Sequence, residues 1–403
     1  MAIVSRLLSK IPWEVHFTFV GLTIFILNQL LGWPLLQFWN IAGIDSGYNK
    51  FNDLSIVLRA AECYSEHGDS VYLTDFYCGN YLYGKSLLIL INTMRLSSIS
   101  VYLLGTILGA IYVFTCGHLI KHLFSQRGNT RAILLIFAPP FLLMIQRGHI
   151  DIFMFFLVVL STYLIWNQRY FLGLVFISMS VLIKFYTAPL LILFLFKLKP
   201  IRYKLLSGTL LIATLITIQS DLRLTPVKPL SDYSGRIWGL FGWDSVIRRI
   251  SETSKFEFEF LQISIYSIVL QVISYVFIYL YLRTRSIPYD EIILDSSQLS
   301  AYYFYTLSIV FVSCYFAGLN FDFRLIFAVI AGLMLLTNLR LSEQANRWSI
   351  GFLTLVSWLS FESGGLEIFG DVLIALLVST YIEVWRLNLW YFFKKQILPV
   401  SNT

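Results

Sequence analysis

The sequence predicts an all-α polytopic membrane protein with about twelve transmembrane helices. Of its 403 residues, 57% are apolar, 17% are aromatic and only 13% are charged, which is not the composition of a soluble globular protein. Its apolar runs approach the roughly 20 residues that a helix needs to cross a bilayer. They lack the alternation over about ten residues that is typical of an outer-membrane barrel. Helices are therefore the expected form of its spans.

The predicted helix cores follow the apolar runs along the chain. They are residues 15–36, 98–120, 132–145, 151–166, 170–183, 185–197, 205–219, 260–282, 299–318, 324–339, 348–360 and 368–385. The first run, "VHFTFVGLTIFILNQLLGW", is long enough to span and is followed by no small-residue cleavage site, so we expect it to remain as a helix. Several cores are short for a bilayer of roughly 30 Å, which favours half-helices or tilted helices there.

The positions of the basic residues predict the orientation. Arg6 and Lys10 precede the first core, and "KHLFSQRGNTR", "KLKPIRYK" and "RTR" fall in alternate loops. The positive-inside rule then places the N-terminus and the basic tail 386–403 in the cytoplasm, with a plasma membrane as the expected location. The net charge of +7 is explained by topology and by attraction to membrane lipids. We expect no nucleic-acid binding. Once topology has accounted for the basic residues, no basic patch with interleaved stacking aromatics remains.

We interpret the chain as one membrane domain, 1–403. Its unusual polar residues map to the opposite, extracytoplasmic side. Its large loops are 37–97, with predicted interfacial helices, and 220–258. Charged side chains from several places in the sequence map to this side: Asp53, Arg59, Arg147, His149, Asp151, Lys184, Asp322 and Arg324. Lys184 interrupts a long apolar run, and a lysine in such a place needs an anionic partner, which is either a phosphate or Asp151.

Several of these residues stand in motifs. "QRGHID" supplies Arg147, Gly148, His149 and Asp151, and "IKFYTAP" supplies Lys184, Tyr186 and Pro189. "NFDFRLIF" carries Asp322 and Arg324, "WDSVIRRI" carries Ser245 and Arg248, and "FNDLSIVLRAA" carries Asp53. Together they resemble the pattern of glycosyltransferase family 87 and its relatives in the GT-C superfamily. The tyrosine-proline-proline stretch of that family is represented only by "NYLYGKSLL", which has no proline.

The resemblance implies a GT-C-like helix bundle that transfers a sugar from a polyprenyl-phosphate donor to a lipid or glycan acceptor outside the cytoplasm. Mannose is the sugar that the resemblance favours. An inverting transfer needs a base for the acceptor hydroxyl, and a carboxylate suits this role. Asp53 is the preferred base and Asp151 the alternative, because Arg147 is close enough in sequence to neutralise Asp151; Glu66, Asp69 and Asp75 also compete. The expected substrate-binding residues are Arg59, Arg147, His149, Lys184, Tyr186, Arg248, Asp322 and Arg324.

No metal or other cofactor is expected, because the histidines show no clustered ligand spacing on the extracytoplasmic side, and Arg and Lys suffice to neutralise a lipid phosphate. His118 and His122 lie four residues apart, but on the predicted cytoplasmic side. Cys63 and Cys78 share the outer loop, where a disulfide bond can form. Two other functions stay open. One is a polymerase or ligase of lipid-linked glycans, and the other is a lipid flippase or transporter, for which an internal repeat is expected.

Overall fold

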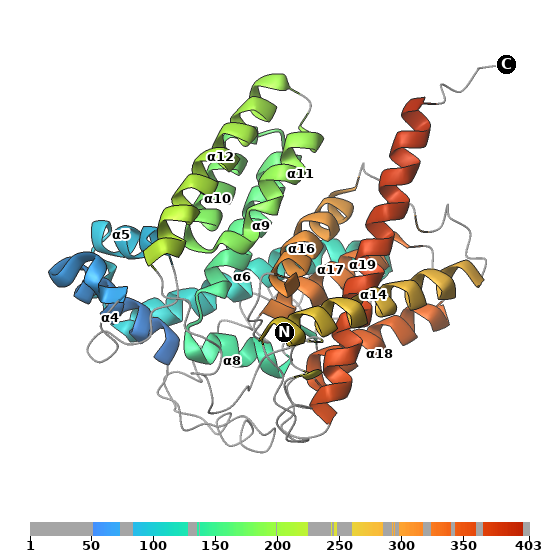
Figure 1. Ribbon diagram of the computed structural model, residues 1–403, viewed down its shortest axis with the longest axis horizontal. Coiled ribbons are helices and arrows are strands. Elements are labelled where there is room, and N and C mark those ends of the chain that lie inside the picture. The colour runs from blue at the N-terminus through green and yellow to red at the C-terminus, as the bar shows by residue number, and fades with distance from the viewer. Residues whose placement is uncertain are drawn as a thin grey trace, which may run out of the picture. The chain divides into compact units, whose positions relative to one another are not determined.

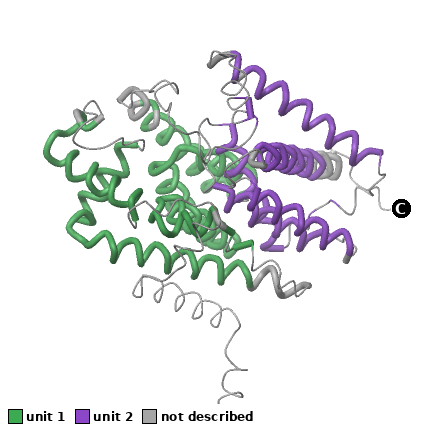
Figure 2. Tube along the Cα trace, turned by 90° about the horizontal axis from the view of Figure 1, so that it is seen from below, with its two compact units in different colours: residues 1–228 green, residues 229–403 purple. Residues whose placement is uncertain are grey.

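The structure is a computed structural model in which the chain forms two compact units, residues 1–228 and 229–403 (Figure 2). It describes residues 51–72, 84–127, 135–136, 138–198, 200–224, 243, 246–247, 260–284, 292, 294, 298–316, 324–339, 343–359 and 366–397. Within these residues all regular structure is helical, which confirms the predicted all-α class. The predicted first span, 15–36, lies outside them, and the assignment of 1–403 to one membrane domain stays a prediction.

The first unit contains eight described α-helices and three short 3-10 helices (Figure 1). They are α4 (Asn52–His67), η1 (Gly68–Tyr72), α5 (Lys85–Thr93), η2 (Leu96–Ser98), α6 (Val101–Arg127), α8 (Pro139–Arg147), α9 (Asp151–Trp166), α10 (Tyr170–Ile183), η3 (Phe185–Thr187), α11 (Pro189–Lys197) and α12 (Ile201–Leu224). Helix α9 packs against α6 and α10, while α12 packs against α10 and α11. Helices α9 and α10 together form the centre of the unit, because α10 also contacts α5 and α11.

The second unit contains α14 (Phe260–Thr284), α16 (Leu299–Phe316), α17 (Leu325–Asn338), α18 (Glu343–Leu359) and α19 (Leu366–Ile397) among its described residues. Helices α14 and α19 run parallel, because Gln271 donates to Ser379 Oγ at 2.9 Å and Tyr275 donates to Glu383 Oε2 at 2.9 Å. Two helices that end on the same side of a membrane must run parallel. The pair is therefore compatible with the predicted orientation, in which both end in the cytoplasm.

Four described helices are long and apolar enough to cross a membrane: Val101–Ile120, Ile265–Thr284, Leu299–Phe316 and Ile368–Leu389. The pair α8 and α9 passes the same test if it counts as one span that is bent by 108°. Helices α10, α11 and α17 are apolar but shorter. The structure thus supports a membrane protein with several spanning helices, and the count of about twelve stays a prediction.

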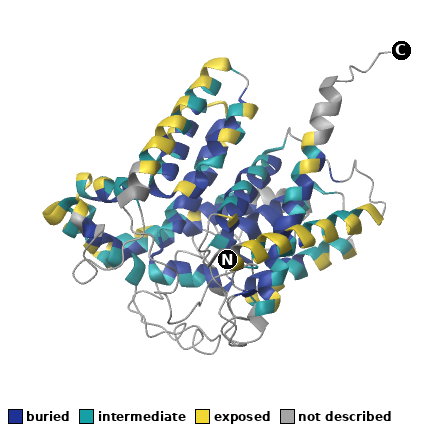
Figure 3. Cartoon of the chain, viewed as in Figure 1, coloured by how far each residue is buried: buried dark blue, intermediate teal, exposed yellow. Residues whose placement is uncertain are grey.

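Helix α14 has the exposure pattern expected of a helix surrounded by lipid. Only 11% of its apolar window is buried, and side chains such as those of Val272 and Phe277 are more than half exposed. Exposed and partly exposed residues cover much of α14 in Figure 3. Its polar residues Gln271 and Ser274 are instead buried, 5% exposed each, and hydrogen-bonded within the unit. Polar groups satisfied inside and apolar groups outside are the arrangement that a bilayer imposes.

The predicted core 132–145 is helical in most of its described part, but it is interrupted at Ala138 and is not one continuous helix. The chain is extended at Ala138, and α8 begins only at Pro139 and ends at Arg147. Proline at the first helical position starts a helix but cannot continue one, because it lacks the backbone N–H and disfavours a helical residue before it. Nine residues span only about 13 Å, so α8 by itself does not cross a bilayer of roughly 30 Å.

The outer loop contains helices, as the sequence predicts, and they are packed onto the first unit. Helix α4 buries Leu54, Val57 and Leu58 and contacts α5, α6 and α8. Asn92 of α5 donates to the carbonyl of Ala61 at 2.9 Å. Cys63 on α4 is disulfide-bonded, whereas Cys78, the partner that the sequence suggests, lies outside the described residues.

The first turn of α4 is fixed by a close contact with α6. The ring of Phe51 is fully buried, and a Cβ atom built on Gly105 of α6 would lie less than 3.0 Å from three of its atoms. We expect Gly105→Ala to lower the free energy of unfolding by about 1–3 kcal/mol, because the ring has to move. Thermal unfolding in nanodiscs measures the change.

Gly351→Ala in α18 is the matched control, because a Cβ there meets nothing within 4 Å. An alanine in a helix without a clash is expected to be neutral or to stabilise by about 0.5–1 kcal/mol. Equal effects of the two substitutions on the free energy of unfolding would show that the close contact between Gly105 and Phe51 does not matter for stability.

Candidate functional site

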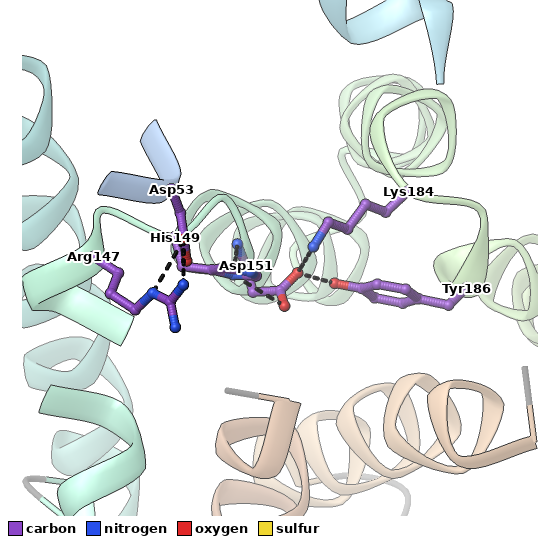
Figure 4. A network of polar contacts seen from close by, with 6 residues as sticks. All are labelled: Asp53, Arg147, His149, Asp151, Lys184 and Tyr186. Atoms are coloured by element: carbon purple, nitrogen blue, oxygen red, sulfur yellow. Dashed lines mark hydrogen bonds and ion pairs between the residues drawn. The ribbon is translucent and has the colours of Figure 1, made fainter. Parts of the chain in front are cut away.

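The candidate site lies in the first unit, where three segments bring ionisable side chains together (Figure 4). The segments are the first turn of α4, the bend between α8 and α9, and the link between α10 and α11. The side chains are those of Asp53, Arg147, His149, Asp151, Lys184 and Tyr186. All six belong to the set that the sequence predicts.

The bend after α8 is built by "RGH". Gly148 has a left-handed conformation with φ 62°; its N–H donates to Ile145 O at 3.1 Å, and the N–H of His149 donates to Met144 O at 3.0 Å. These two bonds form a Schellman motif, which ends a helix and favours glycine at this position. A Cβ atom on Gly148 would also lie 3.1 Å from Leu54 Cβ. Glycine therefore both turns the chain and lets α4 approach.

Helix α4 is attached to this bend through its backbone. The N–H of Phe51, a residue with left-handed φ, donates to the carbonyl of Gln146 at 2.8 Å. Asp53 in the first turn then meets Arg147: Nε of the guanidinium lies 3.0 Å, and one terminal nitrogen 2.8 Å, from the same oxygen, Oδ1. The Asp53 side chain is 13% exposed and that of Arg147 is 25% exposed. This ion pair lies at the edge of the protein.

Asp151, the first residue of α9, is fully buried and holds a second set of contacts. Its Oδ1 accepts hydrogen bonds from Lys184 Nζ at 2.6 Å and from the Tyr186 hydroxyl at 2.5 Å. Its Oδ2 lies 3.2 Å from His149 Nδ1. Lys184 is only 8% exposed and His149 only 6%. A buried charge is retained when it is paired and hydrogen-bonded, and Oδ1 meets that condition through Lys184 and Tyr186. His149 Nδ1 instead accepts a hydrogen bond of 3.2 Å from the backbone N–H of Asp151, so its contact with Oδ2 is not a hydrogen bond.

The link between α10 and α11 directs Lys184 and Tyr186 to the same carboxylate. Lys184 is extended and follows the last residue of α10, and a single turn of 3-10 helix follows it. The turn is fixed by a hydrogen bond of 3.0 Å from Ser180 Oγ to Thr187 Oγ1. Pro189 then begins α11, where the missing N–H of a proline costs nothing.

One reason for preferring Asp53 as the base is wrong. From the spacing in "QRGHID" we expect Arg147 to neutralise Asp151, but the ion pair of Arg147 is with Asp53. The Schellman turn sends Arg147 back toward α4, while Asp151 lies on α9 beyond the bend and meets Lys184. Of the two partners proposed for Lys184, the structure shows the carboxylate of Asp151. Asp53 still differs from Asp151 in being partly exposed to an incoming molecule.

Among the predicted site residues that the structure describes in the first unit, Arg59 does not join this cluster. Arg59 is on the exposed face of α4, and Arg324 precedes α17 in the second unit. Among the rival acids, Glu66 is exposed and Asp69 pairs with Lys85 at 2.7 Å. That hydrogen bond is the main cause of the raised pKa of Lys85. Asp75, Arg248 and Asp322 lie outside the described residues.

Sequence reasoning missed the residues that shape the site without carrying charge. Phe51, Gly105 and Ser180 hold the three segments in place, as described above. The available signals were the glycine inside the apolar helix 101–127 and the small polar residues just before Lys184. Both have common packing explanations in membrane helices, so neither identifies a site without coordinates.

The described residues contain no group of side chains that suits a metal ion. Among the residues that the structure describes, no three His, Cys, Asp or Glu side chains are grouped so that they hold a metal ion. The prediction of a metal-independent protein stays a prediction.

Comparison of the chain with protein-family models, with curated proteins and with solved structures finds no significant match. The function is therefore argued from the residues of the site.

Proposed function

We propose that this protein is a membrane glycosyltransferase of the GT-C type. It transfers a sugar from a polyprenyl-phosphate donor to a lipid or glycan acceptor on the extracytoplasmic face. The observation that carries the proposal is the contact between a partly exposed carboxylate, Asp53, and a partly exposed guanidinium, Arg147, beside apolar helices. One group of this kind accepts a proton and the other binds a lipid phosphate. The resemblance of the motifs to glycosyltransferase family 87 supports the same function.

In the proposed reaction the acceptor hydroxyl attacks the anomeric carbon from the side opposite the phosphate. The carbon–oxygen bond to the phosphate breaks, and its electron pair stays on the lipid phosphate. Asp53 takes the proton of the hydroxyl as general base. Arg147 donates hydrogen bonds to the phosphate, whose charge grows in the transition state, and such charge-assisted bonds are strong where water is scarce. No metal is required for this division of roles.

The buried cluster around Asp151 has a different role in this proposal. Asp151 is 0% exposed, and its Oδ1 is held by hydrogen bonds from Lys184 and Tyr186. An acceptor has no path to such a carboxylate unless the cluster opens. We assign these residues to positioning: they hold α9 against the link between α10 and α11 and so fix the bend that carries Arg147.

The test is a transfer assay with the full chain in nanodiscs. Radiolabelled polyprenyl-phosphate sugars, mannose first and then other hexoses and pentoses, are supplied with a lipid extract as acceptor. We expect labelled product from the wild type and none from empty nanodiscs. Arg59→Gln, which alters an exposed cation on the same helix as Asp53, is the matched control and is expected to remain active.

The alternatives predict other products. Addition of many repeat units to one acceptor from a diphosphate-linked glycan indicates a polymerase or ligase. Movement of the labelled lipid across the bilayer without transfer of the sugar indicates a flippase. Failure of every monophosphate donor to transfer its sugar would overturn the proposal.

A further inference from the structure

The ion pair between Asp53 and Arg147 has an incomplete geometry. An arginine and a carboxylate pair most strongly when two nitrogens meet two oxygens. Here Nε and a terminal nitrogen both meet Oδ1 of Asp53. Among the described residues, Oδ2 of Asp53 accepts no hydrogen bond. The guanidinium thus occupies Oδ1 of Asp53, the proposed base, but it does not form the stronger pairing with both oxygens.

The two ion pairs of the site also differ in burial. Asp151 and Lys184 are buried, and their contact of 2.6 Å is reinforced by Tyr186. The side chains of Asp53 and Arg147 are 13% and 25% exposed, so an incoming anion can reach them. A partly buried ion pair breaks at less cost than a fully buried one, because a ligand or water can take over its contacts. Of the two pairs, only this one is suited to break during a reaction.

The backbone around this pair is fixed although the side chains are partly exposed. The Phe51 N–H bond to Gln146 O and the Schellman motif at Gly148 hold the start of α4 against the end of α8. If Arg147 turns to a new anion, Asp53 therefore remains close by. A phosphate is the matching anion, because it replaces one negative charge with another and offers two oxygens to the fork of the guanidinium.

We propose that the phosphate of the lipid donor binds Arg147 by displacing Asp53, so that donor binding releases the carboxylate that serves as the base. This inference rests on the proposed function and adds an order of events to it. Before the donor binds, Oδ1 of Asp53 is occupied by the guanidinium and is not available to an acceptor hydroxyl. After the donor binds, both oxygens are available next to the anchored phosphate.

The test measures binding of a lipid phosphate without any sugar or acceptor. Farnesyl phosphate is titrated into the full chain in nanodiscs, with farnesol as the uncharged control. If the carboxylate competes with the phosphate, Asp53→Asn binds farnesyl phosphate about fivefold more tightly than the wild type, the factor expected for releasing a surface ion pair. Binding of farnesol stays unchanged. Asp53→Ser removes the same carboxylate and replaces Asp53→Asn if that variant does not fold.

Three further variants test whether the effect depends on the contact between Asp53 and Arg147. Arg147→Gln is expected to bind farnesyl phosphate at least fivefold more weakly, and adding Asp53→Asn to it brings no gain, because the competing partner is absent. Asp53→Glu keeps a carboxylate and is expected to keep the wild-type affinity. Equal or weaker binding by Asp53→Asn overturns the exchange alone. No binding of farnesyl phosphate by the wild type overturns the proposed function together with the exchange.

Discussion

Asp53→Ala is expected to lower the rate of sugar transfer by about 10²–10⁴-fold, the contribution typical of a general base. The fold should be retained, because the side chain is partly exposed and its loss leaves Arg147 at the edge of the protein, where water can solvate it. Transfer of radiolabelled sugar in nanodiscs gives the rate. Thermal unfolding of the same sample shows whether the variant is folded.

Asp69→Asn is the matched control for this prediction. Asp69 belongs to the same outer loop and also pairs with a cation, Lys85, but it lies in η1 beyond the end of α4. Its loss is expected to leave transfer close to the wild-type rate. A well-folded Asp53→Ala protein with full activity would show that Asp53 is not the base.

Asp151→Ala is expected to destabilise the protein by about 3–5 kcal/mol, the range found when one partner of a buried ion pair is removed. The substitution leaves the ammonium of Lys184 and the hydroxyl of Tyr186 buried without the oxygen that they share. The positive charge on Lys184 then has to be solvated or lost, and both cost free energy. The change is measured by denaturant unfolding in detergent micelles.

The double variant Asp151→Asn with Lys184→Met is the control for burial of charge. It removes both charges while keeping similar volumes, and we expect it to recover most of the lost stability. A variant Asp151→Ala that is as stable as the wild type but inactive would contradict the positioning role. It would instead make Asp151 the base.

The helical segments are the part of the structure that the sequence predicted best. The cores 151–166 and 170–183 match α9 and α10, and 260–282 falls within α14. Apolar runs interrupted by short polar turns determine such segments, because every backbone polar group in lipid must be bonded within its own helix. The prediction failed at 132–145, where Pro139 and Pro140 restart the helix in the middle of an apolar run.

The composition of the site was also predictable, but its pairing was not. Charged residues next to apolar runs are costly in a membrane and therefore point to a site, which is how Asp53, Arg147 and Lys184 were identified. Their partners follow from directions that spacing along the chain does not encode. Arg147 is four residues from Asp151 in sequence yet pairs with Asp53, 94 residues away.

The sequence by itself therefore determined the helical class, and it predicted the spanning helices and the candidate ionisable residues, because these depend on local composition and on the period of apolar residues. Only the tertiary structure decided which carboxylate is exposed and which is buried. The 108° bend between α8 and α9, the left-handed Gly148 and the close approach of α4 to α6 at Gly105 make that choice. The bend and the left-handed glycine are local features of the backbone, whereas the approach at Gly105 is a contact between distant segments. All three fix where a side chain points rather than which side chain is present.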